Sequence, residues 1–185
     1  MLDLNEFIES CQSALQEHVP QRAVNELMQR TLSTPNEVEA TLGTPKAGGI
    51  TTLHHADDLT ILNIVWPPGM TLFPHDHCMW AVIGIYGGQE NNTFFRRSPQ
   101  GLDLAGTKTL ETKDSVILGP EVIHSVHNPR KAFTGGIHIY GGDFFAEPRS
   151  EWDPNTLQEQ PYDIENARRA FAAANAAWLA RGESP

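Results

Sequence analysis

The chain has 185 residues, of which 39% are apolar and 19% charged, an ordinary composition for one globular domain with a sizeable core. Lys and Arg number 13 against 23 Asp and Glu, and the resulting net charge of −10 argues against nucleic acid or a membrane surface as a partner. The two cysteines, Cys11 and Cys78, form neither a disulfide framework nor a cysteine-based zinc motif, which favours a cytoplasmic location.

The first 43 residues are predicted to be helical. Apolar residues between Leu4 and Leu15 recur at spacings of three and four, as on one stripe of an amphipathic helix. Pro20 interrupts this pattern, which then resumes. Pro35 follows a threonine and suits the first position of a short third helix.

Residues 48–142 are predicted to form a β-barrel. Leu59–Trp66 and Met79–Tyr86 are rich in β-branched and aromatic residues, and Gly and Pro turn signals separate them from further short strands. No helical pattern lies between these strands, which favours an all-β sandwich or barrel. Helical spacing returns at 163–181. We therefore expect a single domain over 1–185, with N-terminal helices at 1–43, the barrel at 48–142 and a C-terminal helix at 163–181.

A pair of histidines flanks one aspartate within the barrel segment. Side chains alternate along a strand, so His75 and His77 face one side and Asp76 faces the other. Two imidazoles on one face of a strand can bind a single cation at about 2.0–2.2 Å. The alternative is a pair of solvent-facing histidines at the end of a strand.

The positions of Gly69, the histidine pair, His124 and Asn128 resemble the two-part signature of the cupin superfamily. That resemblance implies a mainly β fold, the cupin double-stranded β-helix or jelly-roll barrel, with an N-terminal helical cap and a C-terminal helix. It also implies that His75, His77 and His124 are metal ligands. Most cupins add a glutamate four or five residues after the pair. Alanine and valine stand there in this chain, and Glu90 lies too far along it.

Within the cupins, the chain resembles the thiol dioxygenase branch, which includes cysteine dioxygenase and 3-mercaptopropionate dioxygenase. The similarity covers residues 59–142, and the motifs that carry it are Trp66-x-x-Gly69, His75–Gly84, Ile123–Asn128 and Ile137–Tyr140. It implies a mononuclear non-haem Fe(II) centre that adds O₂ to the sulfur of a small thiol and yields a sulfinate. Zn or Ni are alternative metals in purified protein, because imidazole suits several first-row ions.

His138 and Tyr140 share one face of a predicted strand. The family places a Ser-x-His-x-Tyr relay beside the iron, so the resemblance implies catalytic roles for these two residues. Gly136 stands where the serine belongs, which shortens the relay and leaves a hydrogen bond of His138 to water. The alternative is an ordinary strand with one buried aromatic residue.

The group that anchors the anion of the substrate is not evident. The family uses an arginine or a glutamine, whereas this chain has Thr51–His55 in the corresponding segment. Alternation would turn either Arg96 or Arg97 inward, with a solvated rim as the alternative. Val82 replaces the cysteine that cross-links to tyrosine in cysteine dioxygenase. Cys78 is predicted to be a small buried residue that faces away from the metal.

Three functions therefore remain open. The first is the Fe(II) thiol dioxygenase, with a small-molecule substrate and O₂ as its partners. The second is a cupin enzyme that uses its metal as a Lewis acid, as a hydrolase, isomerase or lyase, and the third is a binding module without activity. A homodimer packed through the amphipathic terminal helices is an open arrangement.

Overall fold

The computed structural model describes residues 2–182, so the expected domain limits at residues 1 and 185 lie outside the described residues. Helices precede and follow the strands, as expected. The helices are α1 (Leu4–Ala14), α2 (Pro20–Leu32), α3 (Pro35–Leu42) and α4 (Ile164–Ala180). The strands are β1 (Gly49–His55), β2 (Thr60–Trp66), β3 (Thr71–Asp76), β4 (Ala81–Gly87), β5 (Gln89–Ser98), β6 (Gly101–Glu111), β7 (Ser115–Leu118), β8 (Ile123–His127), β9 (Thr134–Tyr140), β10 (Ser150–Trp152) and β11 (Glu159–Pro161).

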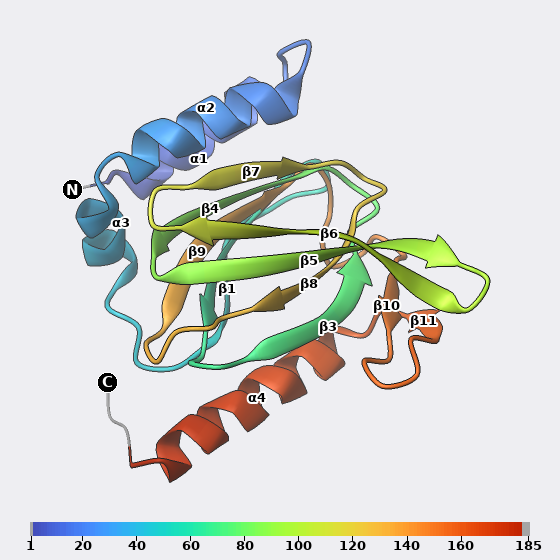
Figure 1. The fold of residues 1–185 in the computed structure, drawn as a ribbon. Helices are drawn as coiled ribbons and strands as arrows, with labels where there is room; N and C mark the ends of the chain where they lie inside the picture. The colour runs from blue at the N-terminus through green and yellow to red at the C-terminus, as the bar shows by residue number, and fades with distance from the viewer. Residues whose placement is uncertain (1, 183–185) are drawn as a thin grey trace.

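The strands form two antiparallel sheets that face each other (Figure 1). One sheet has the order β1-β2-β9-β4-β7 and the other has the order β11-β10-β3-β8-β5-β6. From β2 to β9 the chain crosses between the sheets at every step except the β5–β6 hairpin. This winding is a jelly roll, or double-stranded β-helix. The predicted mainly β fold with terminal helices is therefore confirmed.

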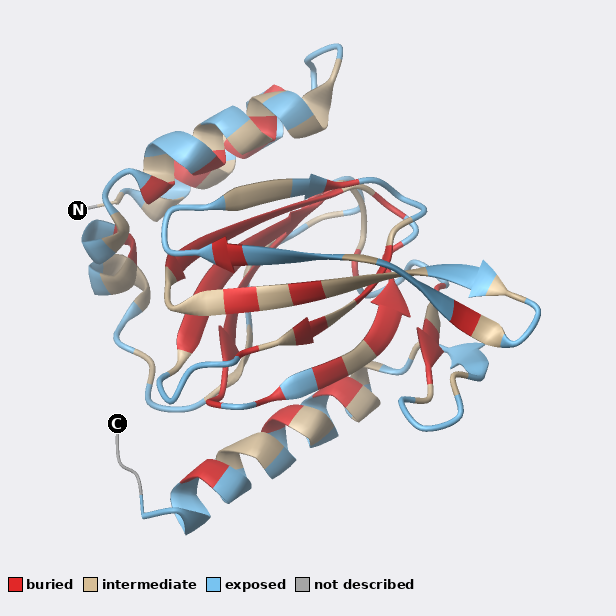
Figure 2. Cartoon of the chain, in the orientation of Figure 1, coloured by how far each residue is buried: buried red, intermediate tan, exposed pale blue. Residues whose placement is uncertain are grey.

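Strands β2, β4 and β9 are buried on both faces, which explains their nearly continuous apolar sequences (Figure 2). One face contributes Leu62 and Ile83 to the core between the sheets. The other face contributes Ile61 and Val82 to a second core under α1, α2 and α3. Gly84 permits this cover, because a Cβ there would lie 2.4 Å from the sulfur of a methionine of α2.

Helix α4 lies on the opposite side of the barrel from α1 and α2 (Figure 1). Its N-cap, Asp163, accepts a hydrogen bond from the backbone of Glu165. Phe171 stacks on Trp66 with ring centroids 5.2 Å apart, and the Asn175 amide bonds both backbone groups of Gly48. In the described part of the chain, no helix is both long and apolar enough to span a bilayer.

A β-bulge in β3 positions the residues that follow it. Leu72 pairs with Val126 of β8, but the next pair is His75 with His124, so two residues of β3 stand where β8 has one. One of the two is Pro74, which has no N–H to give to the ladder. Leu72 and His75 therefore both point into the barrel although they are three residues apart.

Candidate metal centre

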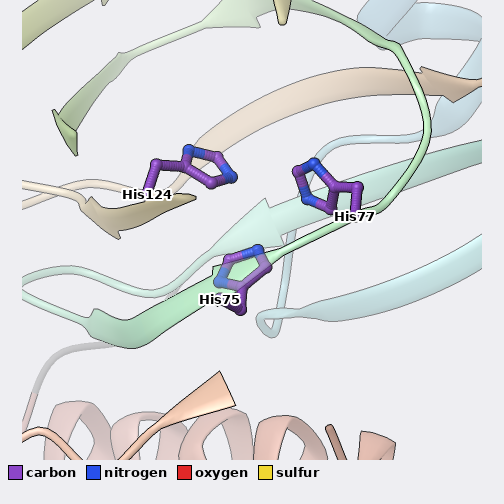
Figure 3. Close-up of side chains that lie close together, drawn as sticks. All are labelled: His75, His77 and His124. Carbon is purple, nitrogen blue, oxygen red and sulfur yellow. The ribbon is translucent and has the colours of Figure 1, made fainter. Parts of the chain in front are cut away.

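Three histidines converge inside the barrel (Figure 3). His75 is on β3, His77 directly follows that strand, and His124 is on β8, opposite His75. All three are buried, their ring centroids are 4.7–5.0 Å apart, and one nitrogen of each lies within 4.8 Å of the others. Asp76 points to the other face, as predicted, where its carboxylate accepts hydrogen bonds from the Ser150 backbone and from Arg97.

The three imidazoles are held in the neutral form that a metal requires. Burial lowers the pKa of His75 to about 4 and lowers the pKa values of His77 and His124 well below 6.5. Nδ1 of His75 lies 3.0 Å from the Phe73 carbonyl oxygen, and Nδ1 of His124 lies 2.7 Å from Oδ1 of Asn92. Because both partners are acceptors, each Nδ1 carries the proton, which leaves the Nε2 lone pair free.

A divalent metal ion fits this set of donors. Nδ1 of His77 and Nε2 of His124 are buried and have no hydrogen-bond partner, a state that costs about 1–3 kcal/mol for each polar group. A bound cation would accept these lone pairs. The cluster contains no carboxylate among the described residues, so an ion held there would keep its full charge. This favours an anionic ligand from the substrate.

Glu90 lies behind the cluster and is not part of it, in keeping with the expectation that it is too far along the chain to be the fourth ligand. Strand β5 pairs with β8, and this pairing brings Asn92 of β5 beside His124. The Asn92 amide donates to Glu90 Oε1 at 2.9 Å, and the Trp66 indole donates to Glu90 Oε2 at 2.8 Å. Glu90 is fully buried. The sequence signal was two polar residues at a spacing of two in a strand, which places both on one face.

The structure brings His138 and Tyr140 to the same site. Both are 2% exposed, and the Tyr140 ring centroid is 5.0 Å from that of His77. The Tyr140 hydroxyl lies 3.4 Å from Nδ1 of His138, and burial raises the pKa of Tyr140, which keeps the hydroxyl protonated. Nε2 of His138 lies 3.5 Å from Glu90 Oε2. This nitrogen has no hydrogen-bond partner among the described residues, so Glu90 is an electrostatic neighbour of it and the expected hydrogen bond to water stays a prediction.

Arg149 is a site residue that the sequence analysis missed. Arg149 is 8% exposed. Its guanidinium lies between the rings of Phe144 and Tyr162, at 4.2 and 3.5 Å from their centroids. Its terminal nitrogens donate to the carbonyl oxygens of Asp76 and Phe144. Next to burial, its charge contributes to the lowered pKa of His75. Within residues 2–182 no carboxylate forms an ion pair with it.

Of the two alternatives for Arg96 and Arg97 the structure shows the solvated rim, and the expectation that Cys78 is buried was wrong. Neither Arg96 nor Arg97 turns inward: Arg96 is exposed, and Arg97 pairs outside the barrel with Asp76 and Glu159 at 2.9 and 3.0 Å. Cys78 is exposed and adopts a left-handed φ of +54°, so it is not a buried apolar residue. In the segment that lacks the family's anion anchor, His55 pairs with Asp143 at 2.8 Å.

The chain matches no protein-family model. Among solved structures it is similar to an RmlC-like cupin from Methanocaldococcus jannaschii, with 14% identity, a TM-score of 0.46 and coverage of 55% of this chain and 85% of that chain. A cupin superfamily protein from Desulfitobacterium hafniense has 17% identity, a TM-score of 0.45 and coverage of 56% and 87%. An oxalate decarboxylase from Bacillus subtilis has 13% identity, a TM-score of 0.45 and coverage of 56% and 27%. The jelly-roll assignment rests on the strand order of this chain itself.

Proposed function

We propose that the protein is a mononuclear non-haem Fe(II) dioxygenase that oxidises a small thiol carrying a carboxylate group. The observation that supports this proposal concerns residues 2–182, in which the cluster of three histidines includes no carboxylate and the nearby buried Arg149 has no ion pair. Arg149 stacks on Phe144 and Tyr162, whose rings neighbour those of His77 and His75. A substrate with two anionic groups matches both features, since its thiolate offsets the charge of the metal and its carboxylate offsets the charge of Arg149. In the reaction, R–SH and O₂ give the sulfinate R–SO₂⁻ and one proton.

His75, His77 and His124 would hold the ion through their imidazole nitrogens. When bound, Fe(II) supplies adjacent coordination positions and the redox chemistry that the side chains lack. The guanidinium of Arg149 offers N–H donors in a planar fork, which suits a carboxylate. The rings of Phe144 and Tyr162 hold that fork in place and keep water from it.

Tyr140 would contact the reacting groups. Its ring lies against His77, and its hydroxyl is the polar end of an otherwise apolar side chain in the interior. A fixed hydroxyl on a side chain that contacts His77 would be able to hydrogen-bond a substrate atom as charge develops on it. The hydroxyl stays protonated throughout the physiological range because burial raises its pKa.

Oxygen uptake by protein loaded anaerobically with Fe(II) tests the function. We expect uptake and sulfinate formation in equal amounts with one of cysteine, 3-mercaptopropionate or mercaptosuccinate, and little with cysteamine, which has no carboxylate. Arg149→Met should raise the KM for the carboxylate thiol about 10²-fold, while Arg96→Met, at an exposed position, should not.

No oxygen uptake with any of these thiols would contradict the proposal. Activity that needs zinc or nickel and is independent of O₂ would then favour the Lewis-acid enzyme. Equal uptake with cysteamine and with the carboxylate thiols would contradict the role of Arg149 but not the reaction.

Tyr140→Phe is expected to keep its metal and to lower kcat about 10²-fold, the usual loss when one positioned donor is removed. Steady-state oxygen uptake and metal analysis on the same sample check this. Tyr86→Phe is the matched control, because Tyr86 is equally buried but bonds Asn63 on the helix-covered face of the sheet. Unchanged turnover in Tyr140→Phe would leave this tyrosine with a packing role only.

A further inference from the structure

Glu90 lies behind the metal centre and contacts Trp66, Asn92 and His138. The proposed reaction gives it no role. It is fully buried, the Trp66 indole and the Asn92 amide donate to its carboxylate, and Nε2 of His138, which has no hydrogen-bond partner among the described residues, lies near it. Two of these contacts are hydrogen bonds of 2.8 and 2.9 Å, and the third, to His138, is an electrostatic contact of 3.5 Å. A buried carboxylate is retained at such a place only when its neighbours donate to it.

We infer that Glu90 is a positioning residue that acts on both sides of the site at once. Through Asn92 it fixes the metal-facing nitrogen of His124, and through His138 it fixes the direction of the Tyr140 hydrogen bond. The first part rests only on the three-histidine metal centre, and the second part rests on the proposed function.

The hydrogen bonds that link Glu90 through Asn92 to His124, the arm toward His124, follow from which atoms of an amide donate and which accept. A carboxylate oxygen has only lone pairs to offer, so the NH₂ group of Asn92 must face Glu90. The amide oxygen of Asn92 then faces His124 and accepts from Nδ1 at 2.7 Å. His124 is thereby held with its proton on Nδ1 and its lone pair toward the cluster. An outer partner of this kind usually changes metal affinity by 10–100-fold.

The contacts that link Glu90 through His138 to Tyr140, the arm toward Tyr140, follow from the position of the proton on His138. A nitrogen lone pair facing a carboxylate oxygen would be repelled, so Nε2 of His138 carries the proton and Nδ1 carries the lone pair. Nδ1 can then only accept from the Tyr140 hydroxyl. Gly136 leaves room for this arrangement, since a Cβ there would already lie 3.2 Å from Nε2 of His138.

Replacing the carboxylate with an amide separates Glu90 from a mere filler of space. Glutamine has the same shape but offers one acceptor oxygen and one NH₂ group, so it cannot accept on both sides as the carboxylate does. In Glu90→Gln the new NH₂ group faces either Asn92, whose amide then loses its acceptor and can flip, or Trp66 and His138, which then lose the oxygen that faces them. We expect this variant to bind Zn(II) about 10–100-fold more weakly than the wild type.

The test uses two measurements that do not require turnover. Competition with a chromophoric chelator gives the Zn(II) affinity, and ¹⁵N NMR of the imidazoles in the zinc-loaded protein gives their tautomers. Asn92→Ala should weaken zinc binding and leave the His138 tautomer unchanged. Asn63→Ala is the matched control for Asn92→Ala, because Asn63 is also buried but bonds Tyr86 on the helix-covered face of the sheet.

The expected wild-type spectrum has His124 protonated on Nδ1 and His138 protonated on Nε2. A His138 protonated on Nδ1 in the wild type would overturn the arm toward Tyr140, whether or not any variant folds. Wild-type zinc affinity in both Glu90→Gln and Asn92→Ala would overturn the arm toward His124. Neither result depends on thiol oxidation, so failure of this inference is distinguishable from failure of the proposed function.

Discussion

His124→Ala is expected to bind metal about 10³-fold more weakly than the wild type. Metal binding by small protein sites is worth about 10–16 kcal/mol, and removing one of three ligands removes on the order of a third of it. The two remaining histidines lie at the end of β3 and directly after it, so both donors come from one short segment of the chain. Metal analysis after desalting, together with a competition titration, measures the loss.

His127→Ala is the control for this variant. His127 lies on the same strand, but its Nδ1 contacts Thr71 and the Met70 carbonyl outside the cluster. It should retain a full complement of metal. If His124→Ala also retains one ion per chain with unchanged affinity, His124 is not a ligand and the third donor lies elsewhere.

Metal-free protein is expected to lose stability as the pH falls from about 6.5 toward about 4. Burial lowers the pKa values of all three cluster histidines, whereas in the unfolded chain each returns to about 6.5. Between these values the unfolded chain binds protons that the folded chain does not, so acid favours unfolding. For His75, with a folded pKa of about 4, the loss at pH 5 is about 2 kcal/mol.

Urea unfolding at pH 7.5 and at pH 5.0, with a chelator present, measures this difference. The wild type should lose at least the contribution of His75, and the other two histidines should add to the loss. In His75→Gln the difference between the two pH values should shrink by about 2 kcal/mol. An unfolding free energy that is equal at both pH values would show that the buried histidines are not the acid-sensitive groups.

The sequence predicted the parts of this fold that depend on local pattern. Strands β2 and β4 were visible because burial on both faces makes them almost wholly apolar. The side of the strand shared by His75 and His77, and the opposite side for Asp76, followed from the two-residue period. The cluster with His124 followed from a resemblance, and the identity of the metal and of the substrate remain predictions.

The missed residues are those that depend on strand order. Glu90 reaches the site because β5 lies next to β8, and no local pattern gives that neighbour relationship. Arg149 precedes the short strand β10, in a segment without the periodicity of a helix or a long strand. A glutamate expected as a direct ligand was absent from its usual place, and the carboxylate that the structure supplies comes from another strand, one layer further out.

The bulge in β3 also determines how the His75 imidazole is oriented, which the spacing of His75 and His77 in the sequence does not indicate. Phe73 and Pro74 have no partner on β8, and the Phe73 carbonyl is the group that accepts from Nδ1 of His75. A chain without the bulge could have the same two histidines at the same spacing. Its Phe73 carbonyl would then accept a backbone hydrogen bond from the neighbouring strand and would not be available to His75. Two chains with the same histidine signature can thus differ in how firmly the first imidazole is aimed. A comparison of the histidine motif alone does not distinguish such chains, whereas the pairing of the two residues before His75 does.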